Sequence, residues 1–143
     1  MKEKDQLTEQ IIGCCFRVHK ALGPGFNEKV YHNALKLLFD KEGLKYQSQK
    51  EFEVFFLNKS VGSFRADLVV EEEVIVEIKS LAGNIPTLFQ NQLVSYLKAS
   101  GIHTGLLLIH VKLMPHACWC VRHSRESRNP VPLPFSGFPL MRE

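Results

Sequence analysis

The sequence predicts one α/β domain over residues 1–110 and a tail of different character over residues 111–143. Three observations predict this fold class: helical periodicity before residue 44, strand alternation in the stretch that follows, and a further helix with a short apolar run before residue 110. A chain of 143 residues is long enough for one domain with a core and short for two.

Two helices are predicted at the N-terminal end of the domain. Apolar residues recur at helical spacing over about residues 6–22, which is typical of an amphipathic helix. A Gly-Pro-Gly run at residues 23–25 ends this helix, because neither residue type continues one well. Asn27 is a suitable N-cap for a second helix, and Gly43 is a natural stop for it.

Three strands follow the helices. Residues 44–57 are rich in Phe, Val and Tyr with polar residues between them, which predicts a first strand, and residues 58–59 read as a turn. Residues 60–70 and 74–79 alternate between apolar and charged or polar side chains, and the acidic run 71–73 separates them. This pattern predicts two strands of period two joined by a short acidic turn.

The register of this hairpin follows from its pattern. A three-residue loop at 71–73 places apolar positions opposite one another, from Val70 facing Val74 to Ala66 facing Ile78. A slip of one residue would pair apolar with polar positions throughout. The predicted hairpin therefore has one coherent apolar face.

The other face of the hairpin carries four charged residues. Asp67 lies opposite Glu77, and Arg65 lies opposite Lys79, with cross-strand Cβ atoms about 4.5–5.5 Å apart. Two carboxylates so close repel each other, and Mg²⁺, which prefers oxygen ligands and completes its shell with water and phosphate, would compensate. Lys79 could then orient or deprotonate a water molecule. The alternative is a solvated hairpin face with cross-strand ion pairs, which the pattern alone leaves open.

A third helix and a buried strand complete the domain. Pro86 suits the first turn of a helix that runs to about Ala99, and the apolar run 105–109 is typical of a strand buried on both faces. Gln92 and Tyr96 share one face of this helix, apart from its apolar stripe. That separation favours side chains that face a site over side chains that fill the core.

Charge and composition exclude some classes of function. Up to His110 the chain carries 13 Lys and Arg against 13 Asp and Glu, so the net charge of +3 comes entirely from the tail. The domain therefore lacks the overall basic footprint of a non-specific duplex binder. No apolar run is long enough to span a membrane and no signal peptide is visible, so we expect a cytoplasmic protein that binds no membrane and keeps its four cysteines reduced.

The acidic pair also carries a family resemblance. Asp67, nine intervening residues and then Glu-Ile-Lys at 77–79 resemble the signature of PD-(D/E)XK nucleases, with Ala66 in the position of the proline. The segment 25–31, Gly-Phe-Asn-Glu-Lys-Val-Tyr, is similar to the motif of the GxxExxY family, a small bacterial branch of that superfamily. Residues 91–98 resemble the helix that follows the motif strand in the same family.

The resemblance, which covers about residues 5–110, implies a fold and an activity. The fold is a restriction-endonuclease-like core of order α-β-β-β-α-β, with a mixed sheet flanked by helices. The activity is hydrolysis of nucleic-acid phosphodiester bonds with Mg²⁺ or Mn²⁺ as cofactor. The implied catalytic set contains three acids, a lysine and a glutamine: Glu28, Asp67, Glu77, Lys79 and Gln92. The three acids of this set would be the metal ligands.

Three further residues are candidates for substrate binding: Tyr31, Arg65 and Tyr96. Tyr31 lies one helical turn from Glu28, where it could stack on a base, but a partly buried structural tyrosine is the equal alternative. Glu28 itself could act only as a favourable acid at a helix N-terminus. The expected partner is nucleic acid, with DNA favoured and RNA left open, and homodimer formation is also left open.

The tail resembles no part of the family. Five of the seven prolines lie in residues 111–143, where they disfavour helices and central strands, and we expect a Pro- and Arg-rich segment of poor order. Arg122, Arg125 and Arg128 could instead form a basic extension that contacts phosphate. Because the C-terminal end differs from the family, two alternatives to a nuclease stay open. One is a non-catalytic module of nuclease-like fold that binds nucleic acid or protein, and the other is a degraded gene product with little function.

Overall fold

The structure, a computed structural model, describes residues 2–81, 86–111, 118–124 and 131–133, with side chains described for residues 6–81 and 86–110. Within these residues the helices and strands follow one another as α1 (Lys2–Leu22), α2 (Glu28–Glu42), β1 (Tyr46–Phe56), β2 (Lys59–Val70), β3 (Val74–Leu81), α3 (Thr87–Ser100), β4 (Thr104–Val111), β5 (Cys118–Ser124) and β6 (Val131–Leu133).

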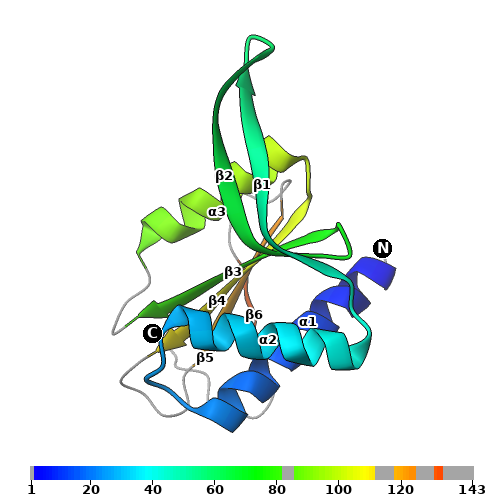
Figure 1. The fold of residues 1–143 in the computed structure, drawn as a ribbon, viewed down its shortest axis with the longest axis vertical. Coiled ribbons are helices and arrows are strands. Elements are labelled where there is room, and N and C mark those ends of the chain that lie inside the picture. The colour runs from blue at the N-terminus through cyan, green and yellow to red at the C-terminus, as the bar shows by residue number, and fades with distance from the viewer. Residues whose placement is uncertain (1, 82–85, 112–117, 125–130, 134–143) are drawn as a thin grey trace.

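The strands form one mixed sheet with the order β1-β2-β3-β4-β5-β6. β3 and β4 are parallel, and every other neighbouring pair is antiparallel. α3 supplies the crossover that two parallel strands require. Helices α1 and α2 lie on one face of the sheet and α3 lies on the other (Figure 1). The predicted fold class, an α/β core with a mixed sheet flanked by helices, is confirmed.

The helix ends follow signals in the sequence. Asn27 caps α2, since its side-chain oxygen accepts a hydrogen bond from the Val30 N–H at 3.2 Å. Gly43 ends α2 in the left-handed conformation with φ of 72°, and Gly101 ends α3 in the same way. The start and end of α2 agree with the sequence prediction. Within the described residues, no helix has the length and apolarity needed to cross a membrane.

Two apolar clusters flank the sheet. Under α1 and α2, alternate residues of β2 and β3 join Tyr31 of α2. Under α3, the intervening positions Val69 and Ile75 pack with Leu93 and Leu97. The apolar run of β4 contributes to both clusters, because this strand lies inside the sheet and is covered on each face.

The β2–β3 hairpin has the predicted register at its loop end. Val70 pairs with Val74, and Leu68 pairs with Val76. The Glu73 N–H donates to the Val70 carbonyl at 3.0 Å and closes the acidic turn. Local alternation and loop length are therefore enough to set this pairing.

The predicted register is wrong one step farther from the loop. Ala66 packs in the α3 cluster while Ile78 packs in the cluster of α1 and α2, so these two residues do not share an apolar face. The ladder ends with the pair of Leu68 and Val76. Asp67 and Glu77 are the next residues along the two strands, and their side chains accept hydrogen bonds from the backbone there.

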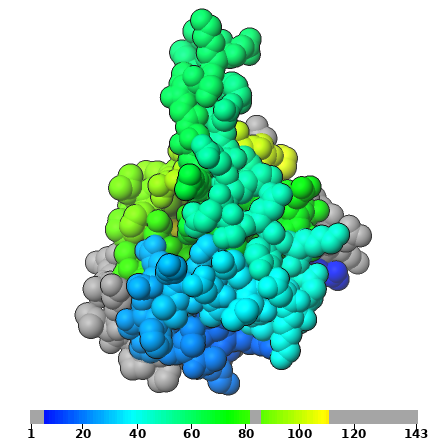
Figure 2. All heavy atoms as spheres, in the orientation of Figure 1, coloured from blue at the N-terminus to red at the C-terminus, as the bar shows by residue number. Residues whose placement is uncertain are grey.

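β1 and β2 continue beyond the body of the molecule as a two-stranded arm, defined as residues 50–65 (Figures 1 and 2). Its tip is a tight turn in which Leu57 and Asn58 both have positive φ, 49° and 61°. This geometry matches the right-handed twist of the flanking strands. The sequence predicts both strands and places the turn one residue later, but it does not predict that the hairpin leaves the body.

Part of the predicted tail pairs with the sheet. β4 runs one residue past the predicted domain boundary at 110, β5 pairs antiparallel with β4, and β6 pairs with β5. The boundary and the poor order expected after it stay predictions, because three segments of the tail lie outside the described residues: 112–117, 125–130 and 134–143. Arg125 and Arg128 of the predicted basic extension lie in the second of these segments.

Candidate active site

Asp67 and Glu77 lie on the neighbouring strands β2 and β3, at the point where the ladder between them ends. The Ile78 N–H donates to Asp67 Oδ2 at 2.9 Å, and the Asp67 N–H donates to Glu77 Oε1 at 3.1 Å. Each carboxylate thus binds the backbone of the opposite strand. These bonds fix both side chains and account for the loss of the ordinary ladder at this position.

The two acids differ in their exposure to solvent. Glu77 is buried, with 4% of its surface exposed, while Asp67 is half-buried. Glu77 is enclosed because β3 lies between β2 and β4 and α3 covers this face of the sheet. The interpretation of a fully solvated hairpin face therefore does not hold for Glu77.

Burial of Glu77 raises its pKa to about 8, and the negative charge of Asp67 adds to that rise. The backbone N–H of Asp67 and the cation of Lys79 lower the same pKa by smaller amounts. Near neutral pH the Glu77 carboxyl therefore holds its proton unless a further cation lies close to the pair.

The donor set of the acidic pair suits a hard divalent cation. Carboxylate oxygens are the protein ligands that Mg²⁺ prefers, and a cation beside Glu77 would offset the repulsion that keeps it protonated. Among the described residues, no three His, Cys, Asp or Glu side chains are grouped closely enough to hold an ion without other ligands. Water and a substrate phosphate would therefore have to complete the shell, which is common for Mg²⁺.

Lys79 lies two residues beyond Glu77 on β3 and so on the same side of the sheet. Its ammonium is 5.0 Å from the centroid of the Phe89 ring on α3. This cation–π contact holds the Lys79 side chain against α3, on the face that carries the two acids.

Gln92 and Tyr96, both on α3, lie near the acidic pair of Asp67 and Glu77. Burial raises the pKa of the Tyr96 hydroxyl, the negative charges of Glu77 and Asp67 add to the rise, and a hydrogen bond from Gln92 lowers it. The hydroxyl therefore lies within reach of the charges of both acids, with Gln92 beside it. Strands β2 and β3 and helix α3 thus bring five of the predicted site residues to one face: Asp67, Glu77, Lys79, Gln92 and Tyr96.

Comparison with protein families agrees with this geometry. A family model described as the PD-(D/E)XK nuclease superfamily matches residues 5–118, which is more than half of the chain. The chain belongs to the PD-(D/E)XK nuclease superfamily. Asp67 and the Glu-Ile-Lys run at 77–79 both lie inside the matched segment, and so does α3.

Comparison with solved structures supports the fold of this PD-(D/E)XK chain. The chain is similar to a protein whose structure is titled "Crystal structure of SSO0001", with 17% sequence identity and a TM-score of 0.53. The match covers 68% of this chain and 50% of the other, so the chain spans half the length of that protein. At this identity the likeness shows the fold alone. No curated protein matches the chain.

The predicted third acid, Glu28, lies at the start of α2 and is exposed. Its Oε1 accepts a hydrogen bond from the Ser80 N–H at 3.3 Å, and Ser80 Oγ donates to the Phe26 carbonyl at 3.2 Å. These bonds tie the N-terminus of α2 to β3, one residue past Lys79. The structure thus brings Glu28 to the strand of the site but not into a group of three acids.

The two other residues predicted to bind substrate, Tyr31 and Arg65, lie outside this group of five, although Arg65 comes only two residues before Asp67 on β2. Tyr31 is 1% exposed, its hydroxyl donates to the Gly23 carbonyl at 2.6 Å, and its ring stacks on His110 at 3.7 Å. This burial favours the structural interpretation of Tyr31. Arg65 is exposed at the base of the arm, and its Nε is 4.0 Å from Glu51 Oε2.

Sequence reasoning missed two residues that touch Asp67. Gln49 of β1 has a positive φ of 54°, and its Nε2 donates to Asp67 Oδ1 at 3.4 Å. His32 of α2 binds the backbone of Asp67, and burial lowers its pKa. No local pattern could have identified either residue, because both contacts depend on how α2 and β1 pack beside β2 in the folded chain.

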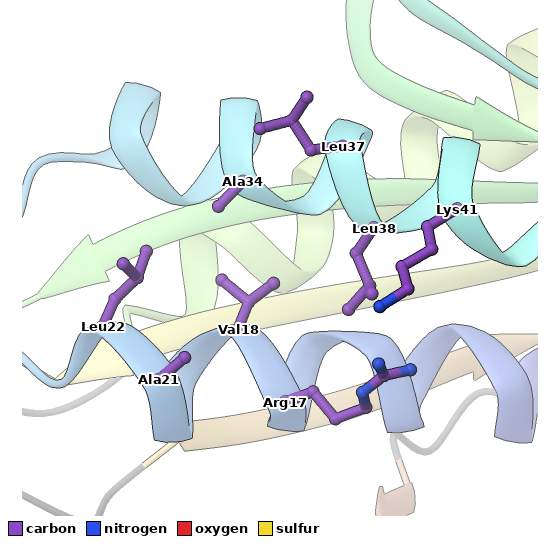
Figure 3. A pocket seen from close by; sticks show the side chains of 8 residues that line it. All are labelled: Arg17, Val18, Ala21, Leu22, Ala34, Leu37, Leu38 and Lys41. Atoms are coloured by element: carbon purple, nitrogen blue, oxygen red, sulfur yellow. The ribbon is translucent and has the colours of Figure 1, made fainter.

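A groove of about 370 Å³ lies between α1 and α2 (Figure 3). Its lining is apolar apart from Arg17 and Lys41, and Arg17 forms an ion pair with Glu42 at 2.7 Å. None of the predicted site residues lines this groove.

Proposed function

We propose that this PD-(D/E)XK chain is a nuclease that hydrolyses phosphodiester bonds of nucleic acid with Mg²⁺ or Mn²⁺. The observation that supports the proposal most directly is the pair of Asp67 and Glu77. Each carboxylate accepts a backbone hydrogen bond from the opposite strand, and Glu77 is buried beside a second negative group. Such an arrangement costs stability in a purely structural hairpin, because burial and the negative charge of Asp67 both disfavour the ionised form of Glu77.

The roles follow from the placement of the side chains. Asp67 and Glu77 would hold the metal, and Glu28, tied to β3 at Ser80, would join them when the substrate is bound. The metal would supply charge neutralisation on the phosphate and a water of lowered pKa. Lys79 would orient that water and stabilise the charge that develops on the phosphate oxygens.

Residues of α3 and of the arm would position the substrate. Gln92 holds the Tyr96 hydroxyl beside the acids, where it can donate to a phosphate oxygen. Arg65 is exposed close to Asp67 along β2 and carries a charge suited to phosphate. Since the domain is neutral overall, substrate binding would depend on these local groups more than on bulk charge.

We also propose a branch of the superfamily, a substrate and a cellular location for this chain. The Gly-x-x-Glu-x-x-Tyr spacing at residues 25–31 supports a place in the GxxExxY branch of the superfamily, with Glu28 at the site and Tyr31 in the core. We propose DNA as the substrate and the cytoplasm as the place of action. A protein of this class would keep buried Cys14 and Cys15 as reduced thiols there.

Removal of the Asp67 charge tests the function. In a Mg²⁺ or Mn²⁺ cleavage assay on linear and circular DNA, Asp67→Asn should lower the rate by a factor on the order of 100 or more, since it removes a proposed metal ligand. Glu73→Gln is the matched control, because it removes one exposed acid from the turn of the same hairpin. Cleavage by wild type and Asp67→Asn at equal rates would contradict the proposal.

One observation favours a second candidate, a module that binds nucleic acid without cutting it. The described residues bring together two acids rather than three. In that case DNA binding would be indifferent to Mg²⁺ and to Asp67→Asn, and no cleavage product would form in either protein.

A further inference from the structure

The end of the arm is apolar and exposed. Phe55, Phe56, Leu57 and Val61 have 63%, 66%, 80% and 62% of their surfaces exposed. The end of the arm projects beyond the body of the molecule, and these four side chains are open to solvent (Figure 2). Four large apolar side chains gathered on a narrow projection indicate a contact surface, whereas single exposed apolar residues need no explanation.

The arm is built so that this tip has a fixed shape. Its turn is tight, with positive φ at Leu57 and Asn58. Val54 pairs with Gly62 and Phe55 with Ser60, so Val61 is an extra residue that forms a bulge. A bulge sharpens the local twist and re-aims the side chains beyond it.

The base of the arm is tied to the candidate site. The Phe52 and Phe64 rings stack across the two strands with centroids 5.2 Å apart, and Phe64 stacks on Tyr96 of α3 at 4.0 Å. Farther along β2 from Phe64 lies Asp67 itself. The base of the arm is therefore held by a contact with Tyr96, which also belongs to the candidate site.

A second copy of the chain fits this surface poorly. Within the described residues the outer edge of β1 is a free edge of the sheet, but it carries Lys50, Glu51 and Glu53, and the neighbouring strand β2 has a bulge at Val61. Charged side chains and bulges are devices that keep edge strands from pairing with one another. We therefore expect the exposed apolar tip to contact a partner other than a second copy of this chain.

We propose that the arm enters the major groove of duplex DNA and that its apolar tip contacts base edges there while the cleaved strand lies at Asp67 and Glu77. The inference rests on the proposed nuclease function. A two-stranded ribbon fits the major groove of B-form DNA, where apolar side chains can contact the methyl group of thymine. Lys59 pairs with Phe56 beside the tip and supplies a cation for the adjacent phosphates.

The length of the arm fixes the span of the contact. Asp67 comes nine positions after Asn58, the second residue of the turn at the tip, which corresponds to about 30 Å of extended strand. At 3.4 Å per step, this reach is roughly nine base pairs of duplex. The arm should therefore contribute to the binding of long duplexes and not to that of duplexes too short to reach from the site to the tip.

The test measures affinity for duplex DNA by fluorescence anisotropy, with Ca²⁺ in place of Mg²⁺ so that binding is separated from cleavage. The variant is Phe55→Ser/Phe56→Ser, and the matched control is Leu37→Ser/Leu88→Ser, which removes two equally exposed leucines from α2 and α3. For a duplex of about 30 base pairs, the arm variant should bind about tenfold more weakly than wild type, and the control within about twofold. For a duplex of about six base pairs, all three proteins should bind alike.

A duplex RNA of the longer length provides a second control. The major groove of A-form RNA is deep and narrow, so the arm variant should lose little affinity for it. Equal affinity of wild type and arm variant for the long DNA would overturn the inference, as would the absence of DNA binding by wild type. Self-association of wild type that disappears in the arm variant, with unchanged DNA affinity, would also overturn it and assign the tip to a second copy. Arm-dependent DNA binding without any cleavage in Mg²⁺ or Mn²⁺ would support the inference and contradict the proposed function.

Discussion

The two faces of the sheet bury ionisable groups in opposite ways. On the face of α1 and α2, His19 and His110 approach at 3.0 Å between their Nδ1 atoms, and His110 stacks on Tyr31. On the face of α3, Glu77 is buried beside Asp67. Burial, which disfavours charge on either kind of group, lowers the pKa of His110 to about 3 and raises that of Glu77 to about 8.

The difference shows which face has chemistry to perform. Burial disfavours the charged form of His110, whose ring stacks on His19 and Tyr31, and the Tyr31 hydroxyl binds the Gly23 carbonyl, so the partners of His110 lie within the fold. The acidic pair keeps one carboxylate half exposed next to Lys79 and Tyr96, and a cation would relieve the repulsion between the two acids. We infer that the first cluster stabilises the fold and that the second is the place for a metal and a phosphate.

The largest expected effect lies on the histidine face and appears in acid. Unfolded His110 binds a proton near its ordinary pKa of 6.5, whereas folded His110 does so only near pH 3. Unfolding therefore takes up a proton between these values, and the free energy of unfolding should fall by up to about 1.4 kcal/mol for each pH unit as pH drops from 6.5 toward 3. Urea titrations across this range measure the slope.

His110→Phe sharpens this prediction. The variant keeps an aromatic ring on Tyr31 and removes the titrating group, so its stability should depend less on pH below 6.5. His103→Phe, at an exposed position before β4, is the matched control and should keep the wild-type slope. Equal slopes in wild type and His110→Phe would show that His110 does not cause the loss of stability in acid.

A smaller effect of opposite sign is expected on the acidic face. Folded Glu77 has a pKa above its unfolded value of 4.5, so its favourable contribution is complete below pH 4.5 and is lost as pH rises toward 8. Glu77→Gln should thus be more stable than wild type at pH 9 without metal, by on the order of 2 kcal/mol, and the gain should vanish in acid. Thermal melts at the two pH values measure it. A variant less stable than wild type at pH 9 would show that the Glu77 charge is already compensated within the fold.

Local patterns in the sequence predict the parts of the site that lie on one hairpin or one helix. The alternation around the acidic turn places Asp67 next to Glu77, and the spacing of four places Gln92 beside Tyr96. The end of the ladder after Leu68 is not predictable from alternation, because carboxylate-to-backbone bonds replace strand-to-strand bonds there.

Contacts between distant elements account for what the sequence could not predict. His32 and Gln49 meet Asp67 only because α2 and β1 pack beside β2 in the folded chain. The arm is encoded as two long alternating strands, but its projection depends on where the helices stop covering the sheet. The spacing of a motif identifies Glu28 and Tyr31 as candidates in the sequence. Only their hydrogen bonds in the folded chain show that Glu28 contacts β3 and that Tyr31 belongs to the core.

Calorimetric titration with Mn²⁺ and Mg²⁺ at pH 7, in two buffers of different ionisation enthalpy, tests whether Asp67 and Glu77 hold the metal. Wild type should bind with release of about one proton per ion, because Glu77 must lose its proton to become a ligand, and Asp67→Ala/Glu77→Ala should not bind. Binding of equal heat and equal proton release by wild type and the double variant would place the metal elsewhere and contradict the assignment of this acidic pair.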